Sequence, residues 1–258
     1  MPNSLLPRLR MATPGNLYCV GVVFLFNLFV PTMQLSAQNN TSESLASQLE
    51  AKKAAFNAAA SDEKKQAYAQ GILEVEQSAA MANALRQGDR APDFRLPAAT
   101  GEMIRLSELL AEGPVVLTWY RGGWCPYCNI SLRAYQQALP EIYQQGGQLV
   151  AISPELPDSS LSTQQKNDLE FYVLSDVGQQ VAQEYNVVYT LPQGVIEQFK
   201  GRLDIPAYNG DDTWQLPLAV TYVIDTDRRI RYAFVDADYR KRAEPAELIE
   251  ALKAIREE

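Results

Sequence analysis

The chain has 258 residues, of which 47% are hydrophobic, and a net charge of −8. This content is enough for a sizeable core and predicts one domain with extensions or two small domains, while the acidic balance gives no support to nucleic-acid binding. The sequence contains no histidine, which excludes Ser-His-Asp and Cys-His catalysis and His-containing zinc sites. Three cysteines are too few for a four-cysteine zinc or iron–sulfur site in one chain. We therefore expect no metal and no cofactor, and chemistry carried by carboxylates, hydroxyls, Lys and Arg, or a cysteine pair.

Residues 1–37 have the pattern of a secretory signal. Arg8 and Arg10 form a basic start, and residues 17–30 are an apolar run that is short for a membrane span. Small residues ending at Ala37 offer a cleavage site, so we expect an exported protein, periplasmic or secreted. The alternative is an uncleaved signal that anchors the chain to the membrane by its N-terminus.

Residues 38–87 are predicted to form a helical N-terminal arm. Two helices are expected, with a break near 57–61 and a start at Ser61 and Asp62. The second helix has an apolar stripe at helical spacing, which comprises Tyr68, Ile72, Val75, Ala79 and Ala82. Such a stripe is typical of a packing arm or of a dimerisation element without chemistry, so a homodimer is one expectation.

Residues 88–258 alternate between strand and helix patterns, which predicts an α/β sandwich. A hairpin is expected around Thr100 and Gly101, and the acidic pairs at 225–227 and 236–238 indicate turns and solvated loops. Residues 188–216 are expected to be irregular and either to cover the cysteines or to mediate dimerisation. The expected strands are 114–120, 148–152, 171–174, 220–224 and 230–235, and the expected helices are 126–145, 158–169, 178–186 and 245–256.

The segment from Trp119 to Cys128 carries the clearest chemical signal. A strand ends, Gly122 and Gly123 turn the chain, and Pro126 suits the first position of a helix, which makes Cys125 its N-cap. Both cysteines then meet free backbone N–H groups and the positive end of the helix dipole, which favour the nucleophilic thiolate.

A redox pair is the favoured interpretation of these two cysteines. Cys19 leaves with the signal, so Cys125 and Cys128 stay as one close pair in a compartment that permits disulfides. Arg121 adds positive charge four residues before Cys125. The alternatives are a structural disulfide, which would stabilise little because its loop is small, and half of a metal site shared by two chains.

The residues from Trp124 to Cys128, Trp-Cys-Pro-Tyr-Cys, resemble the thioredoxin and glutaredoxin active site. Their surroundings resemble the peroxiredoxins of the alkyl hydroperoxide reductase and thiol-specific antioxidant type. The segment 88–96 is similar to that family's G-x-x-A-P-x-F-x-L opening, and 221–225 to its T-F-V-I-D stretch. The resemblance spans about residues 88–256 and implies a thioredoxin-like fold with a central mixed sheet, flanking helices and thiol redox chemistry.

The sequence departs from this family at three positions. The register from Tyr120 puts Arg121 at the family's proline, Cys125 at its threonine and Cys128 at its peroxidatic cysteine. The family's activating arginine falls at Ala219, so Arg121 is a candidate replacement. The thioredoxin register reverses the two cysteines and makes Cys125 the nucleophile.

The resemblance implies a thiol peroxidase that acts on hydrogen peroxide or organic hydroperoxides and is regenerated by a thioredoxin-like dithiol protein. The alternative enzyme is a thiol–disulfide oxidoreductase that acts on exported proteins or small disulfides, and a binding or redox-sensing module is a third hypothesis. The candidate catalytic residues are Cys128, Cys125 and Arg121. Three aromatic residues, Tyr120, Trp124 and Tyr127, are candidates for a substrate-binding rim, with packing around the helix start as their alternative.

Overall fold

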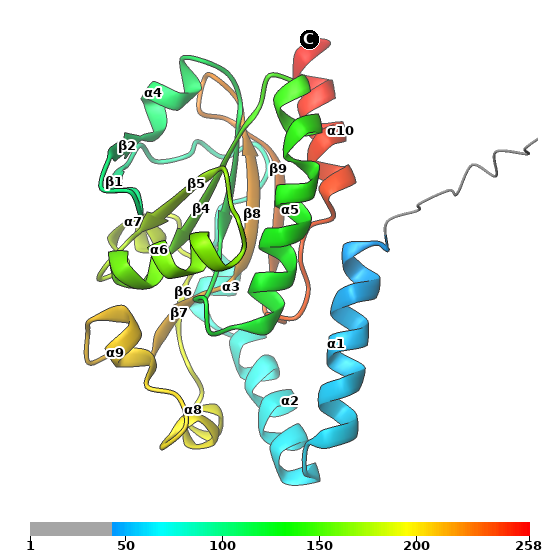
Figure 1. Cartoon of the computed structure of the whole chain (residues 1–258), viewed down its shortest axis with the longest axis vertical. Helices are drawn as coiled ribbons and strands as arrows, with labels where there is room; N and C mark the ends of the chain where they lie inside the picture. Colours follow the sequence, from blue (N-terminus) through cyan, green and yellow to red (C-terminus); the bar gives the residue numbers. More distant parts are fainter. Residues whose placement is uncertain (1–42) are drawn as a thin grey trace, which may run out of the picture. The chain divides into compact units, whose positions relative to one another are not determined.

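A computed structural model describes residues 43–258, and its centre is a mixed five-stranded sheet (Figure 1). The strand order is β5-β4-β3-β8-β9, in which β3, β4 and β5 are parallel and β8 and β9 are antiparallel to their neighbours. The strands are β3 (Val115–Trp119), β4 (Gln148–Ser153), β5 (Tyr172–Ser175), β8 (Ala219–Ile224) and β9 (Ile230–Asp236). The predicted sandwich with a central mixed sheet is confirmed.

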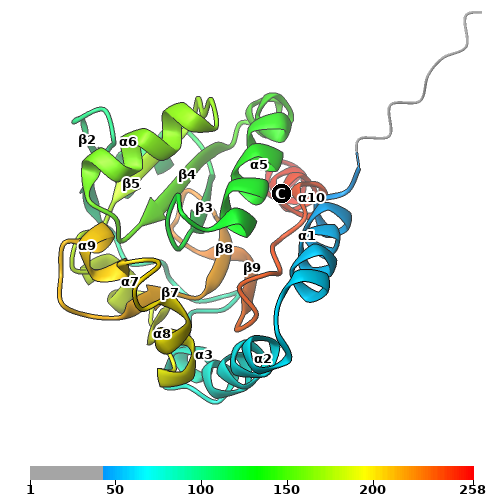
Figure 2. The same ribbon diagram turned by 60° about the horizontal axis from the view of Figure 1, so that its bottom comes forward.

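Both faces of this sheet carry a hydrophobic core, which explains why its central strands β3 and β8 are buried along their whole length. Helices α5 (Pro126–Gln144) and α10 (Pro245–Arg256) lie side by side against one face (Figures 1 and 2). Leu117 and Trp119 belong to the core on the opposite face, while Val116 and Tyr120 belong to the core under α5. The alternation of β3 therefore supplies both cores and places its carboxyl end beside the start of α5.

The arm contains the two predicted helices, α1 (Leu45–Ala59) and α2 (Asp62–Glu76), and a third that was not predicted, α3 (Ala79–Asn83), which carries Ala79 and Ala82 of the expected stripe. Each begins after a serine whose hydroxyl accepts a backbone N–H bond from the first turn, namely Ser44, Ser61 and Ser78. The carboxylate of Glu244 also accepts the backbone N–H groups of Leu45 and Ala46, which ties the start of α1 to the residue before α10.

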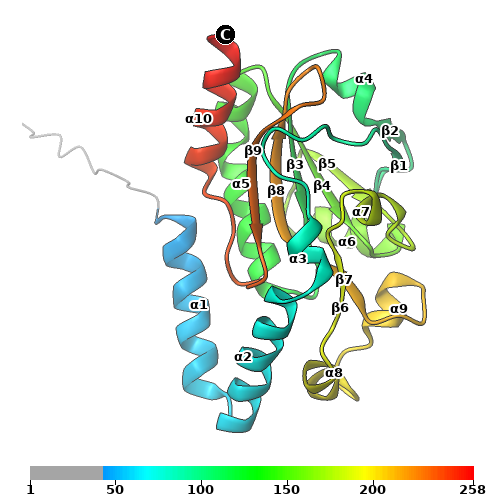
Figure 3. The ribbon, with the colours of Figure 1, turned by 180° about the vertical axis from the view of Figure 1, so that it is seen from behind.

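The prediction that residues 188–216 are irregular is wrong. The segment contains a two-stranded antiparallel sheet, β6 (Val188–Thr190) with β7 (Gln215–Pro217), and two short helices, α8 (Gln193–Phe199) and α9 (Ile205–Asn209). Its prolines and glycines lie at the boundaries and inside these short elements rather than in a structureless loop. Helix α8 packs against α2 of the arm, so this segment and the arm meet (Figures 2 and 3).

The predicted hairpin is also present, as the antiparallel pair β1 and β2. The remaining elements are β1 (Arg95–Pro97), β2 (Met103–Arg105), α4 (Leu106–Leu110), α6 (Pro157–Lys166) and α7 (Gln180–Glu184).

Several predictions concern residues 1–42, which lie outside the described part of the chain. They include the signal over 1–37 and the removal of Cys19. The domain boundaries, the homodimer and export stay predictions. Among the helices within residues 43–258, none is both long enough and apolar enough to cross a membrane.

Candidate active site

The two cysteines stand where β3 turns into α5, as the sequence predicts. Cys125 is the N-cap of α5 and Pro126 is its first residue. Gly122 has a φ of +147°, a conformation that favours glycine. A Cβ at Gly123 would lie 2.0 Å from the hydroxyl oxygen of Thr163 on α6, so only glycine lets the turn approach that helix so closely.

Asn129, which the sequence analysis missed, holds this turn from inside the helix. Its side-chain amide donates to the carbonyl oxygens of Gly123 and Cys125, each over 2.8 Å. Its amide oxygen accepts a 2.7 Å bond from Asn167, and Asn129 is itself buried. These bonds fix the backbone on both sides of Cys125 before any substrate arrives.

Cys128 lies in the first turn of α5 with no exposed surface, and a guanidinium contacts its sulfur. Arg242 Nη2 lies 3.1 Å from Cys128 Sγ. Arg242 is itself 7% exposed, and its Nη1 donates to the backbone carbonyls of Tyr239 and Lys241. The cation is therefore held in place by the backbone and is aimed at this sulfur.

The environment separates the pKa values of the two thiols. Burial opposes ionisation of Cys128, but the hydrogen bond from the Cys125 thiol, the charges of Arg242 and Arg121, and the Arg121 backbone N–H together lower its pKa. Burial raises the pKa of Cys125, and its hydrogen bond to Cys128 adds to that rise. The arrangement thus favours a Cys128 thiolate that accepts a hydrogen bond from the Cys125 thiol.

Sequence reasoning did not find Arg242, which follows β9 by six residues. The signal was present, because Ala219 replaces the family's activating arginine and pairs with Asp236 at the end of β9. The chain that continues past Asp236 therefore starts beside Ala219, and its Arg242 brings a guanidinium to Cys128. The prediction of a solvated acidic loop at residues 236–238 is wrong for Asp238. Asp238 is instead 9% exposed and binds Arg240 through two hydrogen bonds of 2.7 and 2.8 Å.

Arg121 is also buried, with 3% of its surface exposed, and its guanidinium stacks on aromatic rings. Its Cζ lies 4.1 Å from the ring centre of Tyr239 and 5.1 Å from that of Trp124. Two of its nitrogens, Nε and Nη2, have no hydrogen-bond partner among residues 43–258. The three candidate catalytic residues are thus brought together, with Arg121 acting on the sulfurs through charge and through its backbone N–H.

The three aromatic candidates for a substrate rim occupy different environments. Tyr120 and Tyr127 are 2% and 5% exposed and belong to the core under α5, which favours the packing alternative. Trp124 is partly exposed and stands against Arg121 and the ring of Phe199 on α8. Among these three, only Trp124 is more than 5% exposed, so it alone keeps the rim as an open interpretation.

A buried carboxyl group, that of Glu155, forms a hydrogen bond with the turn before α5. Glu155 is 1% exposed, and its Oε2 accepts the Gly123 backbone N–H over 3.0 Å. Burial raises its pKa to about 7, against the lowering effect of that hydrogen bond, and the nearby Cys128 thiolate adds to the rise. Sequence reasoning gave no reason to select this glutamate.

No group of three or more Cys, Asp and Glu side chains within residues 43–258 has a geometry that would hold a metal ion. Both cysteines are free thiols. The site is therefore built from two sulfurs, two buried guanidinium groups and a buried carboxyl group.

Comparison with known proteins places this site in a family. The sequence model of the AhpC/TSA family matches residues 87–233, more than half of the chain. The chain belongs to the AhpC/TSA family. It is 26% identical over 154 residues to peroxiredoxin Bcp of Escherichia coli, which covers 60% of this chain and 88% of that protein.

Solved structures agree with this assignment. The crystal structure of peroxidoxin BcpB from Mycobacterium tuberculosis is 25% identical, with a TM-score of 0.53 over 66% of this chain and 98% of that one. The reduced 2-Cys peroxiredoxin of Plasmodium vivax shares the fold, with 17% identity and a TM-score of 0.53 over 67% of this chain and 83% of that one. As an AhpC/TSA protein with the thioredoxin-like fold, this chain is an oxidoreductase of the peroxidase type.

Proposed function

We propose that this AhpC/TSA protein is a two-cysteine thiol peroxidase in which Cys128 attacks the peroxide and Cys125 resolves the product. The observation that carries the proposal is the 3.1 Å contact between Arg242 Nη2 and Cys128 Sγ. A guanidinium beside one sulfur stabilises its thiolate, and the thiolate is the nucleophile. The same environment keeps Cys125 protonated, with a pKa above its ordinary value because it is buried and bonded to Cys128.

The chemistry then follows in two balanced steps. In the first, the Cys128 thiolate attacks one oxygen of the hydroperoxide, an S–O bond forms and the O–O bond breaks. The other oxygen leaves with the electron pair, takes a proton and departs as water or alcohol. In the second, Cys125 gives up its proton and attacks Cys128 Sγ, so that an S–S bond forms, the S–O bond breaks and water leaves.

A thioredoxin-like dithiol protein would complete the cycle by reducing the Cys125–Cys128 disulfide. Its dithiol is oxidised as the two thiols of this chain are restored. Because Cys125 and Cys128 are 1% and 0% exposed, the start of α5 must open before a protein reductant reaches either sulfur. The alternative, a thiol–disulfide oxidoreductase, would need the same opening, because a protein disulfide would have to reach the same buried sulfurs.

The test uses the two single variants Cys125→Ser and Cys128→Ser as matched controls for each other. Each protein is treated with hydrogen peroxide in the presence of a reagent specific for sulfenic acid. We expect Cys125→Ser to form trapped sulfenic acid and Cys128→Ser to form little, because only the first retains the sulfur that Arg242 contacts. Peptide mapping of the oxidised wild-type protein should show both cysteines in one disulfide-linked peptide.

The reverse pattern, with sulfenic acid in Cys128→Ser alone, would assign attack to Cys125 and contradict the proposed roles. Stable mixed disulfides between Cys128→Ser and exported proteins, with no reaction of either variant with peroxide, would replace the peroxidase by the oxidoreductase.

We also propose that the protein is exported and that the mature chain begins at or near Gln38. The support comes from the basic start, the short apolar run and the small residues ending at Ala37. N-terminal sequencing of protein from the exported fraction measures the start directly. A full-length protein retained in the membrane would support the anchored alternative.

A further inference from the structure

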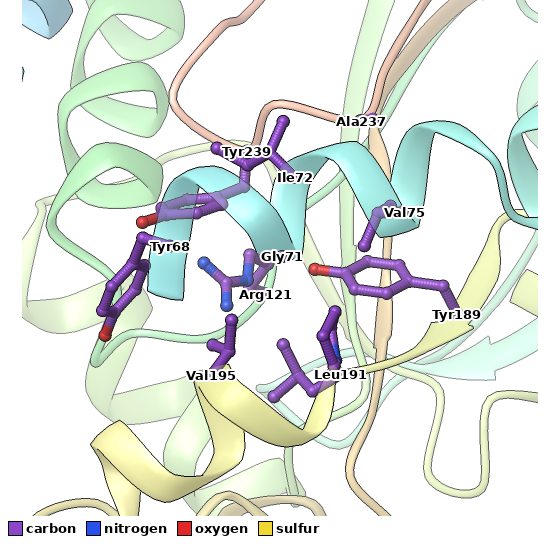
Figure 4. A pocket seen from close by; sticks show the side chains of 11 residues that line it. Tyr68, Gly71, Ile72, Val75, Arg121, Tyr189, Leu191, Val195, Ala237 and Tyr239 are labelled. Carbon is purple, nitrogen blue, oxygen red and sulfur yellow. The ribbon is translucent and has the colours of Figure 1, made fainter. Parts of the chain in front are cut away.

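A small cavity lies over Arg121, between helix α2 of the arm and the segment that carries β6 and α8. Figure 4 places the Arg121 guanidinium in the middle of the side chains that line it. Neither cysteine is among the lining residues, so this space is separate from the reacting sulfurs. The two walls contribute Gly71, Val75, Tyr189 and Val195.

The cavity has room for one water molecule or one ion of similar size. The centre of a water-sized sphere can move within only about 10 Å³ of it, which is close to the minimum for one ordered water molecule. The walls meet closely at Gly71, where a Cβ would lie 2.5 Å from Val195 Cγ2. Sulfate and phosphate are too large for this space, and a monatomic ion is the class of anion that fits.

Arg121 offers free hydrogen-bond donors beside this cavity. Its Nε and Nη2 are buried and have no hydrogen-bond partner among residues 43–258. The two N–H groups lie on one edge of the planar guanidinium and point in nearly the same direction, so a single acceptor can take both. The rings of Tyr239 and Trp124 lie against the guanidinium, and its edge is left for a ligand. In Figure 4 the hydroxyl of Tyr189 points toward the same guanidinium and adds a third donor.

Positive charge exceeds negative charge around the two cysteines. No ion pair between residues 43 and 258 includes Arg121 or Arg242. The titratable groups that act most strongly on the charge of Arg121 are two tyrosines and the two cysteines, and none is a carboxylic acid. Burial raises the pKa of the tyrosines and of Cys125, and the pKa of Cys128 alone is lowered. One thiolate therefore faces two buried cations near neutral pH.

A buried cation without a counter-ion is costly, and so is a buried N–H group without an acceptor. A water molecule in the cavity would satisfy the N–H groups of Arg121 but would supply no negative charge. An anion does both, because it accepts charge-assisted hydrogen bonds and compensates the guanidinium.

We propose that this cavity binds one chloride ion, held by Nε and Nη2 of Arg121 and by the hydroxyl of Tyr189. Arg121 stands where the family's motif has proline, so the motif itself does not provide this site. The inference goes beyond the proposed peroxidase function and does not depend on which reaction the sulfurs carry out.

The chloride ion and the Cys128 thiolate share the charge of Arg121, which couples them. Each anion weakens the binding of the other, and this effect is reciprocal. Cys128→Ser removes the thiolate, so at pH 7 this variant should bind chloride about fivefold more tightly than the wild-type protein, or tighter still. Equal affinities in the two proteins would place the ion away from Arg121 and overturn the proposal.

Bromide locates the site directly, because it replaces chloride and scatters X-rays anomalously. The protein is residues 38–258, the proposed mature chain, crystallised from sodium bromide. We expect an anomalous peak within hydrogen-bond distance of Arg121 Nε and Nη2. Peaks at other places only, which would be adventitious ions, or a water molecule at this position would contradict the proposal.

Urea unfolding measures the affinity in solution. Chloride is replaced step by step by gluconate, an organic anion too large for the cavity, at constant sodium concentration. Arg121→Gln removes the two donors, whereas Gly71→Ala keeps every donor and pushes a methyl group toward Val195. Arg202→Gln is the matched control, because Arg202 is exposed and does not line the cavity.

We expect the folding equilibrium constant of the wild-type protein and of Arg202→Gln to rise about tenfold when chloride reaches about ten times its Kd, along the saturation curve of one site. Arg121→Gln and Gly71→Ala should lose this saturable rise. If Arg121→Gln does not fold, Gly71→Ala decides alone, since its donors are intact. The absence of a rise in the wild-type protein, or an equal rise in all four proteins from salt acting on the whole surface, would overturn the proposal.

Discussion

The strand–turn–helix segment 119–128 and the segment 236–244 after β9 build this site together, and they contribute different things. The first supplies both sulfurs, the helix start and Arg121 within ten residues of sequence. The second supplies Arg242, which contacts Cys128 from a position 114 residues later. The first segment thus sets where the sulfurs lie, and the hydrogen bond from Cys125 together with the charge of Arg242 from the distant segment lowers the pKa of Cys128.

Tyr239 joins the two segments at one residue. Its ring lies 4.1 Å from Arg121 Cζ, and its backbone carbonyl accepts a hydrogen bond from Arg242 Nη1. The ring also packs edge-on against Tyr127 of α5, with the ring centres 5.7 Å apart. The comparison therefore teaches that the C-x-x-C motif places two sulfurs at the start of one helix, while a second segment brings a guanidinium to only one of them, on which the proposed order of reaction depends.

The largest effect is expected when the second segment loses the Arg242 guanidinium. Arg242→Gln should raise the pH midpoint of Cys128 ionisation by about two pH units, equivalent to roughly 2.7 kcal/mol, because a buried thiolate loses its contacting cation. The rate of sulfenic-acid formation at pH 6 should fall by about tenfold or more and recover as the pH rises. Titration of thiolate absorbance at 240 nm and the rate–pH profile measure both effects.

Arg240→Gln is the matched control for that experiment. Arg240 lies two residues away and binds Asp238 rather than either sulfur. We expect its titration and rate profile to overlay those of the wild-type protein. Equal effects of the two substitutions would mean that Arg242 acts by folding the segment and not through its charge.

A substitution at Glu155 tests how the turn of the first segment contributes to the stability of the folded protein. Its pKa in the folded protein is about 7, above the ordinary value of 4.5, so the folded state binds its proton more tightly than the unfolded chain does. The protonated Glu155 side chain therefore contributes to the stability of the folded state. This contribution is fully present below about pH 4.5 and is lost as the pH rises through about 7. Glu155→Gln stays neutral and keeps an oxygen for the Gly123 N–H, so it should become more stable than the wild-type protein by roughly 2–3 kcal/mol between pH 5 and pH 8.

Urea unfolding at a series of pH values measures that difference. Asp158→Asn is the control, because Asp158 is an exposed carboxylate that lines the same surface pocket as Glu155 and Gly123. Its stability difference from the wild-type protein should not change in this way. Parallel stability curves for Glu155→Gln and the wild-type protein would show that Glu155 is ionised throughout and that its burial is compensated.

The sequence predicted the elements whose patterns are local. The buried run of β3, the N-cap and proline at the start of α5, and the Ser61 cap of α2 are each readable within a few residues. The 188–216 segment was mispredicted because its strands are three residues long and are stabilised by pairing between residues 25 to 29 positions apart, from Thr190 with Gln215 to Val188 with Pro217. Propensity within a short window carries no information about such a pairing.

The same distinction holds for the candidate site. Cys125, Cys128 and Arg121 come from one motif and were found, whereas Arg242 and Glu155 come from other parts of the chain and were not. The departure at Ala219 was the one indication that a cation had to come from elsewhere, and Arg121 was chosen because it was near in sequence.

The smallest predicted effect is that of Arg121→Ala, and it distinguishes the contributions of the two arginines to the pKa of Cys128. Arg121→Ala should raise the pH midpoint of Cys128 ionisation by about one pH unit or less, a smaller shift than Arg242→Gln produces. The reason is that Arg121 acts on the sulfur through its side-chain charge from a stacked position on Tyr239, and the backbone N–H that also stabilises the thiolate survives the substitution. Thiolate absorbance at 240 nm is titrated side by side for the wild-type protein, Arg121→Ala and Arg121→Lys, in which the lysine keeps the charge without the planar guanidinium. Arg121→Lys should stay close to the wild-type midpoint, because the lysine keeps the positive charge. A shift in Arg121→Ala as large as that in Arg242→Gln would contradict this ranking and show that the stacked guanidinium stabilises the thiolate as strongly as the one that contacts it.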